Sequence, residues 1–215
     1  MKSITSRRAF LAAGLALPAA AKGTIPETRR TGVTTPEPAR FRSAAPEMQY
    51  RKLGRSALKI SALGFGCMLT SDASVLQRAA DLGVNHFDTA RVYQRGNNEH
   101  MVGAALKSRR KEIILASKTL APNKQRALLD LDESLKALST DHLDIWYLHD
   151  KRSASQITDD LIEAQQIAKQ QGKVRFAGLS LHSSYAEVFP AVIRNGKIDV
   201  VLVTYNFAME GRIDP

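Results

Sequence analysis

The 215-residue chain has an ordinary globular composition, 44% hydrophobic and 24% charged, so it carries enough apolar material for one folded core. Its formal net charge is +10, but about half of this excess lies in residues 1–48 and no long basic run follows, which argues against nucleic-acid binding. A single cysteine, Cys67, excludes an internal disulfide and a multi-cysteine metal site, and no apolar run is long enough for a membrane-spanning helix.

The first 21 residues predict an export signal. A basic head containing Arg7 and Arg8 precedes the apolar stretch 10–21, and Ala19-Ala20-Ala21 offers an A-x-A site for cleavage after Ala21. This arrangement resembles the bacterial twin-arginine signal peptide. We therefore expect the twin-arginine export machinery as a partner, a periplasmic location, and no stable membrane span in the mature chain.

Residues 22–47 predict a disordered linker. Pro26, Pro36, Pro38 and Pro46 lie there among Thr, Glu and Arg, with few large apolar side chains to offset the entropy lost on ordering. The folded domain is expected to comprise residues 48–215.

From residue 49 the pattern becomes regular. Gln49–Leu53 and Leu58–Ser61 predict a small hairpin, and a short apolar strand runs into Leu63–Met68. Further strands are expected to begin near Val84, Ile113, Leu143, Val174 and Val200. Amphipathic helices are expected between them, at Ala73–Leu82, Glu99–Lys107, Lys124–Leu138, Thr158–Gln170 and Ser184–Arg194. Gly83, Gly172 and Gly196 follow helix ends, where a left-handed cap is favourable.

Such βα units build a parallel sheet, either an open doubly wound sheet or a barrel. The open dinucleotide fold needs G-x-G-x-x-G after its first strand, but the segment 64–69 reads Gly-Phe-Gly-Cys-Met-Leu and lacks the third glycine. A barrel instead gathers polar residues at the carboxyl ends of several strands. We therefore predict an α/β fold of the (β/α)8 TIM-barrel type, with about six of the eight βα units present.

Four ionisable residues follow the predicted strands. Asp88, Lys118 and His149 each end a strand, and Tyr93 follows Asp88 by five residues. Because side chains alternate along a strand, these three share the faces of His86, Ala116 and Tyr147. In a barrel, all four side chains would converge at one mouth.

These groups suit the reduction of a carbonyl. A free tyrosine has a pKa of about 10, and a nearby ammonium lowers it by stabilising the phenolate. Asp88 would keep Lys118 charged, and a neutral His149 could donate a hydrogen bond to the carbonyl oxygen. Hydride would then reach carbon while Tyr93 delivers a proton to oxygen, and no metal is needed.

The sequence here resembles the aldo-keto reductase family. Phe87–Tyr93, followed by Gly96-Asn97-Asn98-Glu99, is similar to the family signature D-T-A-x-x-Y-x-x-G-x-N-E, and Ala116–Lys118 and Leu143–His149 resemble its lysine and histidine strands. The hairpin at 50–61 resembles the one that closes the barrel bottom. The resemblance covers residues 48–210.

The resemblance implies an NAD(P)H-dependent oxidoreductase that reduces aldehydes or ketones, with Asp88, Tyr93, Lys118 and His149 as catalytic residues. It also implies that Asp88 helps hold the nicotinamide ribose and Ser180 the carboxamide. We expect a small-molecule carbonyl substrate, NADP(H) in preference to NAD(H), and no metal. The expected cofactor contacts are Gly66, Cys67, Asp88, Ser180, His182 and Tyr205.

The chain departs from the family pattern in places. Leu181 stands where Asn often follows the serine, and Leu202 stands where Gln is frequent. The chain ends at Pro215, after a sixth strand, where the family has eight, so we expect a barrel truncated at its C-terminus. The segment beyond would carry the family's nicotinamide-stacking tyrosine and the residues that read the 2′-phosphate.

Other readings compete with these roles. His86 is favoured as an interior packing residue, Cys67 as a small buried hydrophobe, and Trp146 as facing the helices. His182 either touches the cofactor or begins the cap of the following helix. The alternative function is a non-catalytic nucleotide-binding barrel that acts as a sensing or accessory subunit, or an inactive fragment.

Overall fold

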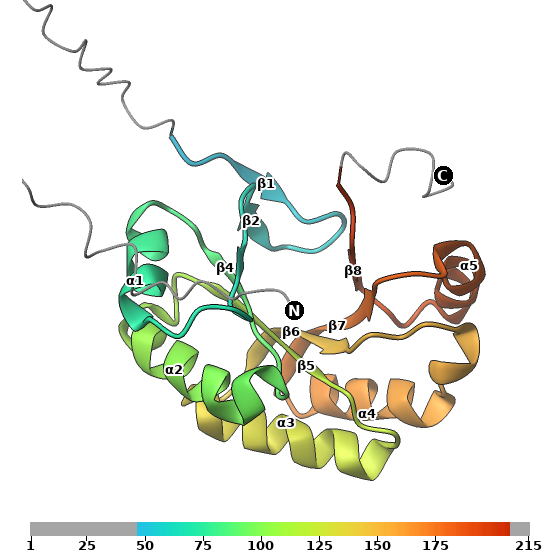
Figure 1. Cartoon of the computed structure of the whole chain (residues 1–215). Coiled ribbons are helices and arrows are strands. Elements are labelled where there is room, and N and C mark those ends of the chain that lie inside the picture. The colour runs from blue at the N-terminus through green and yellow to red at the C-terminus, as the bar shows by residue number, and fades with distance from the viewer. Residues whose placement is uncertain (1–46, 207–215) are drawn as a thin grey trace, which may run out of the picture. The chain divides into compact units, whose positions relative to one another are not determined.

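The computed structural model describes residues 47–206, and its centre is a six-stranded parallel sheet (Figure 1). Each strand lies beside the next strand in the chain, so the order in the sheet is the order in the sequence. They are β3 (Phe65–Gly66), β4 (His86–Asp88), β5 (Ile114–Thr119), β6 (Leu143–Leu148), β7 (Val174–Leu181) and β8 (Val200–Val203). This order excludes a doubly wound sheet, whose strand order reverses at its centre. The predicted signal peptide lies outside the described residues, and so does the predicted linker except for its last residue, Glu47.

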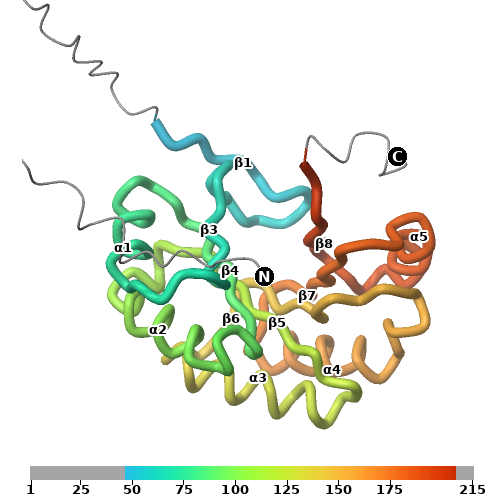
Figure 2. Tube along the Cα trace, in the orientation of Figure 1, coloured from blue at the N-terminus to red at the C-terminus, as the bar shows by residue number. Residues whose placement is uncertain are grey.

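A helix follows each strand from β3 to β7 and packs on the outer side of the sheet (Figure 2). The helices are α1 (Ala73–Asp81), α2 (Asn97–Leu106), α3 (Lys124–Leu138), α4 (Asp159–Gln170) and α5 (Tyr185–Asn195). Asp72, Asn123 and Thr158 cap three of them, each side chain accepting a backbone N–H of the first turn. All five helices were predicted to within two residues. Gly83, Gly172 and Gly196 have φ of 89°, 73° and 68°, which confirms the left-handed helix ends.

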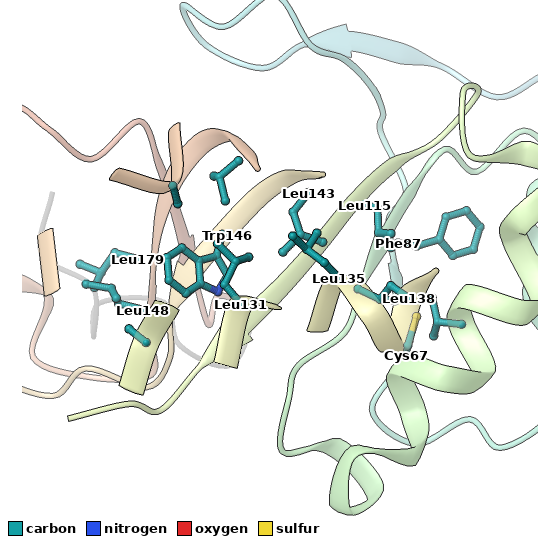
Figure 3. Close-up of a cluster of buried hydrophobic side chains, with 14 of the residues drawn as sticks. Cys67, Phe87, Leu115, Leu131, Leu135, Leu138, Leu143, Trp146, Leu148 and Leu179 are labelled. Atoms are coloured by element: carbon teal, nitrogen blue, oxygen red, sulfur yellow. The ribbon is translucent and has the colours of Figure 1, made fainter. Parts of the chain in front are cut away.

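The strands are apolar on both faces, and each face builds its own core. Phe87, Trp146, Leu148 and Leu179 belong, together with Leu131 of α3, to one buried cluster between the sheet and the helices (Figure 3). Trp146 is fully buried in this layer, as predicted. The opposite face carries a second cluster comprising Leu58, Ile114, Ala116, Ile145, Tyr147 and Val200. Strand alternation therefore divides the side chains into an outer and an inner layer.

The predicted hairpin forms and covers the amino ends of the strands. β1 (Tyr50–Lys52) pairs antiparallel with β2 (Lys59–Ser61). Asn85, just before β4, holds β2 by accepting from the backbone N–H of Ser61 at 2.7 Å and donating to the carbonyl of Lys59 at 2.9 Å. Leu58 and Ile60 add apolar side chains to the inner cluster. The carboxyl ends of the strands are left as the open end of the sheet.

The sheet does not close within residues 47–206, because β3 and β8 are its two edges. Val201 and Val203 on β8 are each 37% exposed. No helix among the described residues is both long and apolar enough to cross a membrane.

Candidate active site

The carboxyl ends of β4, β5 and β6 bring three of the four predicted side chains together, and the turn after β4 adds the fourth. Asp88 ends β4, Lys118 lies near the end of β5, His149 follows β6, and Tyr93 begins a short 3₁₀ segment, Tyr93–Gly96. Parallel pairing with in-register neighbours brings these strand ends to one side of the sheet. The predicted convergence at one mouth is therefore observed.

Lys118 is the centre of this cluster. Its Nζ donates to Asp88 Oδ1, to the backbone carbonyl of Thr89 at 2.8 Å and to Tyr93 Oη at 3.2 Å. The lysine is only 2% exposed, so its charge relies on Asp88 for compensation. An ammonium has three protons to donate, and here each has an acceptor. The Tyr93 oxygen accepts from Lys118, which leaves the phenolic proton free for a further acceptor.

His149 lies beside the tyrosine and is neutral. The two rings meet edge to face, with centroids 5.8 Å apart and planes inclined by 78°. Burial, and then the charge of Lys118, lowers the pKa of His149 to about 4. Its Nδ1 is buried without a hydrogen-bond partner among the described residues. A neutral imidazole at this place can donate one hydrogen bond to a bound molecule.

The segment that carries Tyr93 is fixed by buried polar side chains. Asn98 accepts from Thr89 Oγ1 at 2.6 Å and donates to the carbonyls of Cys67 at 2.8 Å and Thr70 at 3.2 Å. These bonds tie the loop after β3 and the loop after β4 to the first turn of α2. Asn98 is completely buried.

Glu99 provides a second anchor for the same segment. It is completely buried, accepts from Ser117 Oγ at 2.6 Å, and pairs with Arg91 at 3.0 Å. Gln94 and Arg95, directly after Tyr93, have φ of 50° and 57°. Such left-handed conformations are costly for residues other than glycine and persist only where the surroundings hold them.

The roles of Asn98 and Glu99 were not predicted beyond their place in the motif. Both are polar residues in the first turn of α2, where solvent exposure would be the ordinary expectation. The signal that could have identified them is their position at the start of a helix that packs on a buried strand.

The predicted cofactor contacts lie at or near the same end of the sheet. Gly66 ends β3, pairs in register with Asp88, and has open space where a Cβ would stand. Ser180 lies near the end of β7 and is buried. Tyr205, just beyond β8, is 70% exposed. These placements are compatible with the predicted contacts, which stay predictions.

Cys67 and His182, the remaining predicted cofactor contacts, differ from each other in their surroundings. Cys67 is fully buried in the outer core, and burial, more than the charge of Asp88, raises its pKa to about 12. The residue is 0% exposed, its backbone N–H donates to the carbonyl of Asp88 at 2.8 Å, and its own carbonyl accepts from Asn98 at 2.8 Å, so its predicted cofactor contact stays a prediction. His182 is exposed, and its Nδ1 lies 2.9 Å from Thr204 Oγ1. Ser184 is the N-cap residue of α5 but makes no side-chain capping bond.

His86 lies on the inner face two residues before Asp88, as expected for an interior packing residue. It is mostly buried, and burial lowers its pKa. Its Nδ1 lies 2.8 Å from the point where a Cβ on Gly64 would stand, so the glycine makes room for the ring.

Comparison with known proteins agrees with this geometry. YqkF of Bacillus subtilis, described as an uncharacterized oxidoreductase, is 35% identical over 184 residues, covering 77% of this chain and 58% of that protein. A probable voltage-gated potassium channel subunit beta of Arabidopsis thaliana is 32% identical over 153 residues, covering 62% of this chain and 46% of that protein. The chain thus spans about half the length of these relatives.

A solved structure is similar over the same region. The aldo/keto reductase of Klebsiella pneumoniae, in complex with NADP and acetate, is 25% identical with a TM-score of 0.63, covering 71% of this chain and 58% of that one. The model of the Aldo/keto reductase family matches residues 64–214. The chain therefore belongs to the aldo/keto reductase family.

Proposed function

We propose that the protein is an NAD(P)H-dependent oxidoreductase that reduces an aldehyde or ketone to an alcohol. The observation that carries this proposal is the hydrogen bond from Lys118 Nζ to Tyr93 Oη at 3.2 Å, because it places an ammonium where it can stabilise the phenolate that proton donation leaves. The oxidoreductase description of YqkF supports it.

The residues at the mouth fit a nicotinamide nucleotide. Asp88 Oδ2 is buried and has no hydrogen-bond partner among residues 47–206, so it is available to accept from a hydroxyl such as those of a ribose. Gly66 beside it leaves open space. Asp88, Gly66 and Ser180 would hold the nucleotide, and the NADP in the Klebsiella pneumoniae complex favours the phosphorylated form. When bound, the reduced nicotinamide supplies the hydride for the carbonyl carbon.

The side chains of the cluster then divide the remaining chemistry. Tyr93 donates its phenolic proton to the carbonyl oxygen, and the Lys118 ammonium stabilises the phenolate that remains. Asp88 pairs with Lys118 and so compensates its charge beside the phenol. His149, neutral because of its lowered pKa, donates a hydrogen bond that orients the carbonyl. One hydride and one proton convert C=O to an alcohol.

Substitution of the proton donor tests this proposal. In the full-length protein, Tyr93→Phe should lower NADPH-dependent reduction of 4-nitrobenzaldehyde by about 10²–10⁴-fold, because proton transfer contributes that much in such sites. NADPH binding, followed by fluorescence, should stay near normal. Tyr50→Phe is the matched control, since the Tyr50 hydroxyl donates to the carbonyl of Gly83 in the hairpin region. Unimpaired turnover in Tyr93→Phe would remove this residue from the mechanism.

A nucleotide-binding subunit without catalysis is the second candidate, and the similarity to a potassium channel subunit beta supports it. In that case Tyr93→Phe and the unaltered protein would bind NADPH equally and would both lack turnover. The presence of the complete set Asp88, Tyr93, Lys118 and His149 favours the enzyme.

We also propose export to the periplasm by the twin-arginine route. The support is the sequence of residues 1–21, in which Arg7 and Arg8 precede an apolar stretch and an A-x-A site. Replacing both arginines with lysine should leave the precursor in the cytosol, as measured by cell fractionation. Undiminished export of the double variant would contradict this route.

A further inference from the structure

Lys151 is a buried lysine at the open end of the sheet that the proposed mechanism does not use. It follows the end of β6 by three residues, and its backbone N–H donates to the carbonyl of Ser180 on β7 at 3.0 Å. The whole residue is only 8% exposed. Lys151 therefore lies between the carboxyl ends of β6 and β7, next to the strand end that carries His149.

Lys151 forms no salt bridge with a carboxylate among residues 47–206, and the one acid that acts on its charge is its neighbour Asp150. Its neighbour Asp150 is the nearest acid in the sequence, but that carboxylate is engaged by Arg152 at 2.9 Å. The other acid at the mouth, Asp88, is paired with Lys118. Once these two pairs are formed, no carboxylate is left to form a salt bridge with Lys151, and the charge of Asp150 acts on it only from nearby.

The charge of Lys151 also acts on His149, the residue that is proposed to orient the carbonyl group. Burial and then Lys118 are the main causes of the lowered pKa of His149, and Lys151 adds to them. Burial likewise lowers the pKa of Lys151, an effect that the charge of Asp150 opposes. Burying a charge is costly unless an opposite charge is supplied, so the site is complementary to an anion that arrives with a ligand.

We propose that Lys151 determines substrate specificity by binding the carboxylate or phosphate of an anionic carbonyl compound. The inference rests on the proposed reductase function, in which Tyr93 and His149 hold the carbonyl group of the same molecule. The anionic group is assigned to the substrate because Lys151 lies beside His149. The anionic group could also be a phosphate of the nucleotide, and the experiment separates these two sources.

The decisive comparison uses Lys151→Met, which keeps the length of the side chain and removes its charge. With 4-carboxybenzaldehyde as substrate, kcat/KM should fall on the order of 10- to 100-fold, mainly through KM, as expected for loss of a charge-assisted hydrogen bond. With the neutral 4-methylbenzaldehyde it should change less than about twofold, and the Kd of NADPH should not change. Lys151→Arg should retain part of the preference for the carboxylate.

The control is Lys111→Met. Lys111 is exposed and precedes β5, at the end of the sheet opposite to the mouth, so this variant loses the same charge without effect on either aldehyde. An equal loss for both aldehydes in Lys151→Met would overturn the proposal in favour of a structural role. A weaker Kd for NADPH with an unchanged aldehyde preference would overturn it in favour of the nucleotide phosphate.

A binding measurement separates failure of this inference from failure of the proposed function. Saturation-transfer NMR with 4-carboxybenzaldehyde and 4-methylbenzaldehyde needs no turnover. If no aldehyde is reduced, the reductase proposal fails, but a carboxylate preference that Lys151→Met abolishes still supports the anion site. Equal binding of both probes to the unaltered protein would overturn it.

Discussion

At the scale of single residues, burial and the proposed chemistry make opposite demands on the charge of Lys118. It is buried, which disfavours an ammonium, yet the proposed mechanism needs its charge to stabilise a developing phenolate. Each of the three protons of its ammonium has an acceptor. Asp88 accepts one and compensates the buried charge, Tyr93 Oη accepts the second, and the backbone carbonyl of Thr89 accepts the third. Removing Asp88 would leave an uncompensated charge in the site, which costs more than the pair itself contributes.

The lowered pKa of His149 predicts how the free energy of unfolding depends on pH. Its folded pKa of about 4 lies below the ordinary value of 6.5, so the unfolded chain binds a proton between these values that the folded chain does not. The free energy of unfolding should therefore fall as the pH is lowered from about 6.5 towards 4. His149→Gln should remove up to about 3 kcal/mol of this fall, measured by urea denaturation across the range.

The control for the pH series is His100→Gln, because His100 is exposed on α2. The free energy of unfolding of that variant should change with pH as it does in the unaltered protein. If His149→Gln also followed the unaltered protein at every pH, the lowered pKa of His149 would be wrong.

The proximity of Asp88, Tyr93, Lys118 and His149 could be predicted from the sequence, because three of them stand at or near the ends of apolar strands and Tyr93 lies in the turn after one. Parallel strands end on one side of the sheet. Lys151 could not be predicted in this way. Its burial depends on the left-handed conformation of Asp150, with φ of 50°, which redirects the chain after β6. Nothing in the local residue pattern indicates that turn.

At the scale of elements, the position of Tyr93 depends on how α2 packs. Gly103 on α2 meets the end of α3, where an added Cβ would lie 2.6 Å from the backbone carbon, Cα and oxygen of Leu138. Backbone atoms cannot rotate away as a side chain can, so the two helices would have to separate. The close approach of α2 and α3 therefore requires glycine here.

Gly103→Ala tests this packing. In a helix interior, alanine ordinarily stabilises by about 1 kcal/mol relative to glycine, but here overpacking should dominate and destabilise by about 1–3 kcal/mol. Ala104→Ser adds one atom at the exposed neighbouring position and should change stability by less than about 0.5 kcal/mol. Urea denaturation measures both, and a Gly103→Ala variant as stable as the unaltered protein would contradict the packing argument.

The helices and strands were predictable because the hydrophobic period changes at each boundary between helix and strand, and Gly83, Gly172 and Gly196 mark three of these boundaries. The polar ties between elements were not. Asn98 reaches Cys67, 31 residues away, and Ser117 reaches Glu99, 18 residues away. Such contacts join separate segments and leave no periodic trace in the sequence.

At the scale of the whole molecule, the order of the strands follows from the sequence of βα units, because right-handed crossovers place successive parallel strands side by side. The curled sheet then has helices outside, a hairpin at the amino ends, and the polar cluster at the carboxyl ends (Figure 1). The proposed function needs the inner face of the sheet and the polar cluster at the carboxyl ends of its strands, and β3 to β7 supply both.

Hydride transfer is the central claim, and an isotope label follows it directly. The full-length protein is incubated with 4-nitrobenzaldehyde and NADPH that carries deuterium at both C4 positions of the nicotinamide, and the alcohol is examined by mass spectrometry and NMR. We predict an alcohol with a single deuterium on its carbinol carbon, and far less of it with Tyr93→Phe. Absence of the alcohol, or an alcohol without deuterium at that carbon, would contradict the account.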